Sequence, residues 1–138
     1  MIRIVIADDH AIVRAGLKQL ICDEPDMIVA HEASSGPGVI ALVRSYDCDV
    51  VLLDVVMPDT DSKDTLQIRR ALPLVILSGY PARQYPLALI HAGANGYVQK
   101  EATAEQLIVA IRAVAEGRKY VSPGVADVLL AEQKRDPD

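Results

Sequence analysis

Residues with carboxylate, hydroxyl or amine side chains follow short apolar runs at four places in this chain of 138 residues. They are Asp8 and Asp9, Asp54, Ser78 and Lys100. Carboxylates can bind a divalent cation, a hydroxyl can donate a hydrogen bond, and an ammonium group can neutralise a nearby anion. Taken singly, such residues usually cap turns or point into solvent. Whether they act together depends on the elements that carry them.

The apolar runs before these residues have the composition of buried β-strands. Residues 50–53 are an uninterrupted Val/Leu run, which is typical of a strand buried on both faces in a parallel sheet. This run predicts a strand over residues 49–54. Comparable runs predict four further strands, over residues 2–7, 27–33, 74–77 and 96–99.

Segments with apolar residues at helical spacing separate the strands. They predict helices around residues 13–21, after the Ser-Ser-Gly-Pro turn at 34–37, and over 107–115, with shorter helices at 59–70 and 87–92. Five strands alternating with about five helices predict a three-layer α/β sandwich with a five-stranded parallel sheet. Because parallel strands end at one edge of a sheet, we expect the polar residues to meet there.

Composition limits the partners and the compartment of the chain. The net charge of −5 and the scattered Lys and Arg residues argue against a nucleic-acid-binding surface. Cys22 and Cys48 are too few for a disulfide scaffold or a zinc site, so we expect reduced thiols in a cytoplasmic protein. The sequence has neither a signal peptide nor an apolar run long enough to span a membrane, so we expect no membrane contact.

Four motifs together resemble the receiver domains of two-component response regulators. They are Asp8-Asp9, Leu53-Asp54-Val-Val-Met-Pro58, Ser78, and Gly96-Tyr-Val-Gln-Lys100. The triplet Asp8-Asp-His10 and the segments 92–97 and 120–123 are similar to the class with a LuxR-type helix-turn-helix output domain. The resemblance implies a flavodoxin-like, CheY-like doubly wound sheet with strand order 2-1-3-4-5. It implies a receiver domain at residues 1–120, and a helix or linker at 121–138 that leads toward a DNA-binding output domain absent from this chain.

The resemblance also assigns roles to individual residues. It implies Asp54 as the phosphoacceptor, Lys100 and Ser78 as catalytic partners, Ser78 and Tyr97 as switch residues, and Asp8, Asp9, Asp54 and the Val56 carbonyl as ligands of Mg²⁺. Physical reasoning supports a cation, because adjacent carboxylates repel one another by several kcal/mol per pair, even at an effective dielectric constant of about 20. The three histidines, His10, His31 and His91, are interpreted as ordinary loop or surface residues.

The implied partners follow from the same resemblance. A sensor histidine kinase would donate the phosphoryl group, and the chain could pair with itself as a homodimer. DNA would be contacted only through the missing output domain, whose action would be transcription regulation. The chain would not be an enzyme in the usual sense, although it would assist its own phosphorylation and dephosphorylation.

Two departures from the family keep alternatives open. Ser62 occupies a position where the family usually has glycine, and the interval between Asp54 and Ser78 is several residues shorter than usual. We therefore expect a stunted or irregular helix at residues 59–72, and a degenerate receiver that binds proteins without phosphorylation is the first alternative. A haloacid dehalogenase-type phosphatase is the second, but that family has an aspartate at the position of Val56.

Overall fold

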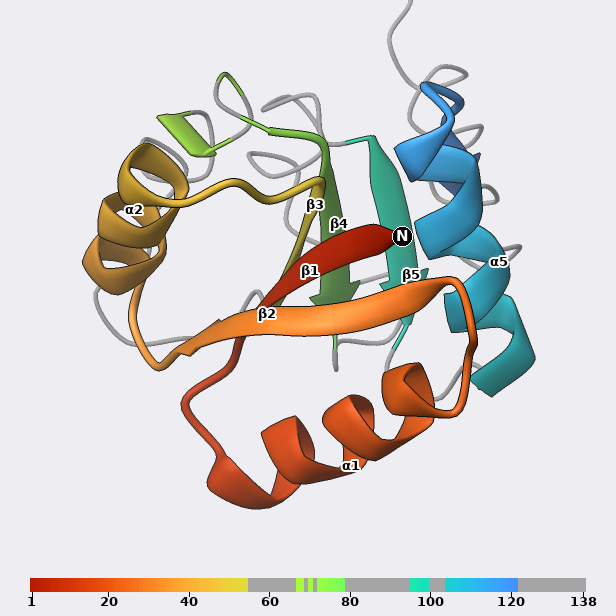
Figure 1. The fold of residues 1–138 in the computed structure, drawn as a ribbon, viewed down its shortest axis with the longest axis horizontal. Helices are drawn as coiled ribbons and strands as arrows, with labels where there is room; N and C mark the ends of the chain where they lie inside the picture. Colours follow the sequence, from red (N-terminus) through yellow and green to blue (C-terminus); the bar gives the residue numbers. More distant parts are fainter. Residues whose placement is uncertain (55–66, 69, 71, 79–94, 100–103, 122–138) are drawn as a thin grey trace, which may run out of the picture.

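The computed structural model describes residues 1–54, 67–68, 70, 72–78, 95–99 and 104–121 (Figure 1). Predictions for the other residues lie outside the described part of the chain. These include most of the short helix predicted at 59–70, the short helix at 87–92 and the C-terminal segment from residue 122. From the stretch expected to hold a stunted helix, Gln67, Ile68 and Arg70 are helical, and Ile68 is fully buried in the core.

The sheet has the predicted strands in the predicted order. Its strands are β1 (Ile2–Ala7), β2 (Met27–Ala33), β3 (Val50–Asp54), β4 (Leu74–Ser78), β5 (Gly96–Gln99) and β6 (Tyr120–Val121). All neighbours are parallel, and the order is β2-β1-β3-β4-β5-β6. The prediction of five strands was therefore one short. The two residues of β6 pair with Gly96 and Tyr97, and a strand of two residues leaves no recognisable pattern in the sequence.

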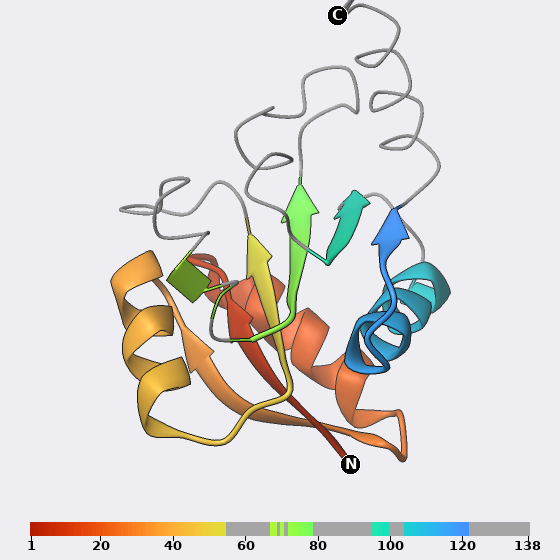
Figure 2. The same ribbon diagram turned by 90° about the horizontal axis from the view of Figure 1, so that it is seen from above.

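Three described helices cover the two faces of the sheet. The first, α1 (Ala11–Cys22), lies with α5 (Ala104–Ala115) on one face, and α2 (Gly36–Ser45) lies on the other (Figure 2). This is the predicted three-layer sandwich. Among the described residues, no helix is long and apolar enough to cross a membrane.

Local sequence signals set the ends of these helices. Ser35 caps α2, because its hydroxyl oxygen accepts a hydrogen bond from the Gly38 N–H at 3.2 Å, and Pro37 lies in the first turn. Gly117 ends α5 with a φ of +83°, a left-handed conformation that glycine adopts without steric cost. α1 ends at Cys22, just before Pro25, which cannot continue a helix.

The core has two halves, one on each face of the sheet. Alternate residues of β3 divide between them, with Val51 and Leu53 packing toward α2, and Val50 and Leu52 toward α1 and α5. All four side chains are essentially inaccessible to solvent. The sheet is thus rigidly packed from both sides, and its strand ends are fixed positions from which side chains can be presented.

Candidate functional site

Three carboxylates and an imidazole gather beyond the ends of β1 and β3. Ligand atoms of Asp8, Asp9, His10 and Asp54 all lie within 4.8 Å of one another. Asp8 and Asp54 are almost completely buried, whereas the Asp9 and His10 side chains are 27% and 62% exposed. The cluster therefore has a buried acidic floor and a solvent-facing rim.

Strand register brings these residues together. β1 and β3 are parallel neighbours, and Ala7 pairs with Leu53, so the next residues, Asp8 and Asp54, arrive side by side at the same edge of the sheet. Because residues 4–7 and 50–53 are buried, the acidic residues can only begin where these buried runs end. The prediction that the three aspartates would meet is confirmed.

Several hydrogen bonds fix the loop that carries Asp8. Its N–H donates to the Ala33 carbonyl at 3.1 Å, and its Oδ1 accepts from the His10 N–H at 2.8 Å. The Arg14 guanidinium donates to the Asp8 carbonyl at 2.5 Å and lies 3.5 Å from a carboxylate oxygen of Glu32. The loop is thus tied to both α1 and β2, and Arg14 is a supporting residue that the sequence alone did not indicate.

Glu32 contacts both Arg14 and Lys18 and so helps to hold Arg14 in place. Its carboxylate accepts a hydrogen bond from Lys18 Nζ at 2.9 Å. This bond, with the charges of Lys18 and Arg14, lowers the pKa of Glu32 below its ordinary value, against the opposing effect of partial burial. The carboxylate therefore stays ionised and keeps Arg14 oriented toward the Asp8 loop.

The donor set of the cluster fits a hard divalent cation. Three carboxylates within a few ångströms repel one another, and a cation bound between them removes that repulsion. Asp9 Oδ1 is buried and accepts no hydrogen bond within the described part of the chain, although His10 Nδ1 is only 3.0 Å away. A buried carboxylate oxygen of this kind gains most from a cation. The arrangement can therefore bind a metal ion beside the Asp54 side chain.

The other predicted site residues are placed only in part. Ser78 is the last residue of β4, one position beyond the pair Asp54 and Leu77, so its backbone lies at the same edge as the cluster. Val56, Lys100 and the side chain of Ser78 lie outside the described residues. Tyr97 is 5% exposed and packs in the core on the α2 face, where it pairs with Ile76 in the neighbouring strand.

The structure places His10, which was interpreted as an ordinary loop residue, at the acidic cluster. Its Nδ1 lies 3.1 Å from Asp8 Oδ1 and 3.0 Å from Asp9 Oδ1, so the ring takes part in the acidic cluster. The adjacency in Asp8-Asp9-His10 was visible in the sequence, but spacing alone does not tell that the extended backbone at His10 turns the ring back toward Asp8. His31, in contrast, contacts the ring of Tyr46 with a centroid distance of 4.2 Å.

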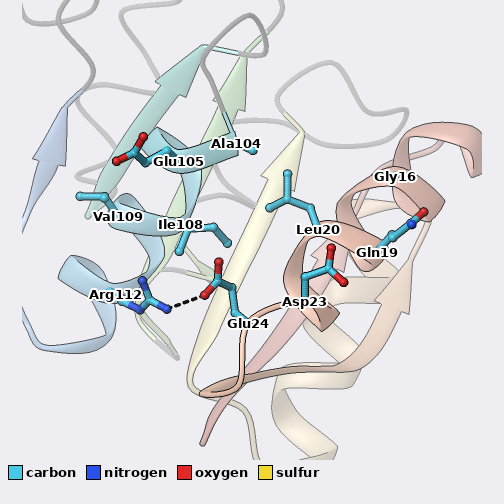
Figure 3. Close-up of a pocket in the computed structure, with 10 residues that line it drawn as sticks. All are labelled: Gly16, Gln19, Leu20, Asp23, Glu24, Ala104, Glu105, Ile108, Val109 and Arg112. Carbon is cyan, nitrogen blue, oxygen red and sulfur yellow. Dashed lines mark hydrogen bonds and ion pairs between the residues drawn. The ribbon is translucent and has the colours of Figure 1, made fainter.

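A separate groove lies between α1 and α5 and contains none of the acidic cluster (Figure 3). It has a volume of about 620 Å³ and is lined by residues between Gly16 and Glu24 and between Ala104 and Arg112. Arg112 donates to Glu24 at 2.8 Å and to Asp26 at 2.9 and 3.0 Å. These hydrogen bonds lower the pKa of Asp26 and clamp the loop after α1 to α5. Two of the groove residues, Arg112 and Glu24, are thus held in a structural contact.

The sequence and the fold are both similar to those of known proteins. Residues 4–112 match the family described as the response regulator receiver domain. The transcriptional regulatory protein DegU of Brevibacillus brevis is 34% identical over 138 residues, which cover 97% of this chain and 58% of DegU. The transcriptional regulatory protein UhpA of Salmonella typhimurium is also 34% identical over 138 residues, which cover 99% of this chain and 70% of UhpA.

A solved structure extends this similarity to three dimensions. The crystal structure of a LuxR-family two-component response regulator from Aurantimonas sp. SI85-9A1 matches with a TM-score of 0.87 at 32% identity. The match covers 96% of this chain and 98% of that one. The fold of this chain is therefore similar, over nearly its whole length, to that of a solved LuxR-family response regulator.

Proposed function

This chain belongs to the response regulator receiver family, and from that premise we propose that it is a phosphoacceptor domain in which Asp54 receives a phosphoryl group from a sensor histidine kinase. The observation that carries the proposal is the position of Asp54. It ends a fully buried strand, and a ligand atom of its carboxylate lies within 4.8 Å of those of Asp8 and Asp9. An acidic nucleophile in that position can attack only if the surrounding charge is neutralised.

The cation expected at this site is Mg²⁺. Asp9 and Asp54 would bind it directly, Asp8 would bind it directly or through water, and the Val56 carbonyl would complete the protein ligands. The support for this assignment is the donor set, since Mg²⁺ prefers carboxylate and carbonyl oxygens together with water. Bound there, the ion supplies positive charge next to the phosphoryl oxygens.

The residues of the chain then promote phosphoryl transfer mainly by orienting the reacting groups and neutralising their charge. A carboxylate oxygen of Asp54 forms a bond to phosphorus while the bond from phosphorus to the imidazole nitrogen of the kinase breaks. The electron pair of that bond stays on the nitrogen, and the kinase imidazole, which carries a proton on its other ring nitrogen, leaves as the neutral base. Lys100 pairs with a phosphoryl oxygen, and Ser78 donates a hydrogen bond to another. Because the transition state is loose, with charge on the peripheral oxygens, orientation and neutralisation account for most of the rate.

Phosphorylation changes the signalling state by shifting the population between two side-chain packing arrangements of the same fold. When Ser78 moves toward the phosphoryl group, it leaves space near β5 into which Tyr97 can turn, and this alters the surface beside the fifth strand. Since phosphorylation of a carboxylate changes the local charge by only about one unit, we expect a coupling free energy of about 1–3 kcal/mol. Such a shift can change self-association into a homodimer or the position of an attached domain.

The physiological result is transcription regulation. DegU and UhpA are both named as transcriptional regulatory proteins, and this chain spans only part of their length. In this proposal, DNA is contacted only through a DNA-binding output domain. Cys22 and Cys48 are free thiols, which supports a cytoplasmic setting, where thiols stay reduced.

Phosphorylation by a small-molecule donor tests the proposal. Incubation with acetyl phosphate and Mg²⁺ should add the mass of one phosphoryl group to the wild type but not to Asp54→Asn, and hydroxylamine should remove it. Asp9→Ala should also abolish labelling, because the cation is lost. Asp49→Asn, which removes a carboxylate away from the site, is the matched control and should be labelled as the wild type is.

Absence of labelling would favour the degenerate receiver instead. In that case the chain would act as a protein-interaction module, an alternative suggested by Ser62 and the short interval before Ser78. A phosphatase of the haloacid dehalogenase type would release phosphate catalytically from added substrates, and sustained turnover without a stable Asp54 adduct would point to it.

A further inference from the structure

We propose that His10 is an additional metal ligand and that it gives the acidic cluster a preference for transition-metal dications over Mg²⁺. The inference rests on the proposed cation site and adds a ligand that the four expected ones do not include. It assigns the imidazole a direct role in choosing the ion. Ions such as Ni²⁺, Co²⁺ and Zn²⁺ are the expected class.

The position of the ring carries the argument. Nδ1 of His10 lies 3.0 Å from Asp9 Oδ1 and 3.1 Å from Asp8 Oδ1. Adjacent ligands of an octahedral ion with bonds of about 2.1 Å are separated by about 3.0 Å. Two edges of such a coordination shell are therefore already present, and both include the imidazole nitrogen.

The ring can bind a metal without disturbing its neighbours. A neutral imidazole carries its proton on one nitrogen only, so Nδ1 becomes a ligand when the proton resides on Nε2. The side chain is 62% exposed, which leaves room for water to solvate the Nε2–H at the rim. The hydrogen bond that orients Asp8 comes from the main-chain N–H of His10, so it does not depend on the ring.

The chemistry of the ligand decides the preference. Mg²⁺ binds oxygen and dehydrates reluctantly, so it gains little from an imidazole that replaces water. Ni²⁺, Co²⁺ and Zn²⁺ bind imidazole well, and their affinity for mixed nitrogen and oxygen sites exceeds that of the earlier divalent metals. One imidazole in an otherwise carboxylate site therefore favours these ions selectively, and occupancy by them would compete with the Mg²⁺ used in phosphorylation.

Metal titration of the whole chain tests the proposal. Isothermal titration calorimetry with Ni²⁺ and with Mg²⁺ should be done on the wild type, His10→Ala and the control His31→Ala, whose ring contacts Tyr46 instead of the cluster. We expect His10→Ala to weaken Ni²⁺ binding at least tenfold, or about 1.4 kcal/mol. Mg²⁺ binding should change less than twofold, and His31→Ala should match the wild type for both ions.

Two further measurements locate the ion. Asp54→Asn should also weaken Ni²⁺ binding, because the site is shared. In the Cu²⁺ or Mn²⁺ complex, pulsed electron paramagnetic resonance should detect coupling to an imidazole nitrogen that disappears in His10→Ala. Equal Ni²⁺ affinities for the wild type and His10→Ala, no nitrogen coupling, or an Asp54→Asn variant with unchanged Ni²⁺ affinity would overturn the proposal.

The test of His10 as a metal ligand can fail or succeed independently of the test of Asp54 as the phosphoacceptor. Mg²⁺-dependent labelling of Asp54 by acetyl phosphate is measured on the wild type, with His31→Ala as the control that should be labelled equally, because its ring contacts Tyr46 and not the cluster. Labelling without selective Ni²⁺ binding would leave the phosphoacceptor role intact and remove this inference. Selective Ni²⁺ binding without labelling of the wild type would support this inference and contradict the phosphoacceptor role.

Discussion

The substitution Asp54→Asn should stabilise the fold when no metal is bound. In Asp54→Asn the amide keeps the shape of the side chain but removes one of three negative charges. Asp8 and Asp54 are almost completely buried, and the ligand atoms of the cluster are at most 4.8 Å apart. At that separation, two unit charges repel by about 3.5 kcal/mol at an effective dielectric constant of about 20.

Part of this repulsion is offset in the wild type. Asp8 Oδ1 accepts a hydrogen bond from the main-chain N–H of His10, and the Arg14 guanidinium donates to the Asp8 carbonyl. Asp54 also has an interaction of its own. We therefore expect a net gain in the free energy of unfolding of about 1–2 kcal/mol for Asp54→Asn in the presence of a chelator, within the range typical of altered buried charges.

Urea denaturation followed by circular dichroism measures the effect. With an m-value of about 2 kcal/mol per M, the midpoint of Asp54→Asn should rise by about 0.5–1 M in chelator. Added Mg²⁺ should stabilise the wild type more than the variant and reduce the difference, because ligand binding stabilises only the folded state that binds it. Asp47→Asn, whose side chain is 93% exposed, should leave the midpoint unchanged. A destabilised Asp54→Asn in chelator would refute the electrostatic reasoning.

Three further predictions address the scaffold and its support. Ile111→Ala, at a fully buried position of α5, should lower the free energy of unfolding by about 2–4 kcal/mol, whereas Val109→Ala, at a 46% exposed position, should cost less than about 1 kcal/mol in the same urea titration. Arg14→Met should weaken Mg²⁺ binding severalfold in calorimetry by loosening the Asp8 loop, with partial recovery in Arg14→Lys; unchanged affinity would show that the contact is dispensable. Asp49 has a pKa lowered mainly by the hydrogen bond from Arg3, so its contribution to stability is present above about pH 4 and is lost as the pH falls through the lower folded-state pKa. Thermal unfolding between about pH 5 and pH 2 should therefore decline less steeply for Arg3→Met than for the wild type, and parallel curves would contradict this.

The sheet and most of the described helices could be predicted because their signals are local. The run over residues 50–53 is apolar without interruption, which only a doubly covered strand accommodates. Ser35 with Pro37, and Gly117, mark helix ends through capping and backbone conformation. Once the strands are parallel, the meeting of Asp8 and Asp54 follows from topology alone.

Features that depend on side-chain direction or long-range pairing could not be predicted. The His10 ring turns toward the carboxylates because of the local backbone, and Arg14 reaches the Asp8 carbonyl across one turn of α1. β6 forms because Tyr120 donates its N–H to the Asn95 carbonyl at 3.0 Å, a pairing with no local signature. A buried tyrosine such as Tyr97 is expected in the core whether or not it acts as a switch, so its burial does not by itself reveal a switch role.

Chemical trapping of the phosphorylated residue tests the central claim most directly. After reaction with acetyl phosphate and Mg²⁺, reduction with borohydride converts an aspartyl phosphate to homoserine, and peptide mapping by mass spectrometry locates the change. We predict homoserine at position 54 alone, with no conversion when Mg²⁺ is chelated. Conversion at Asp8 or Asp9, or no conversion anywhere in a correctly folded chain, would contradict the assignment of Asp54 as the phosphoacceptor.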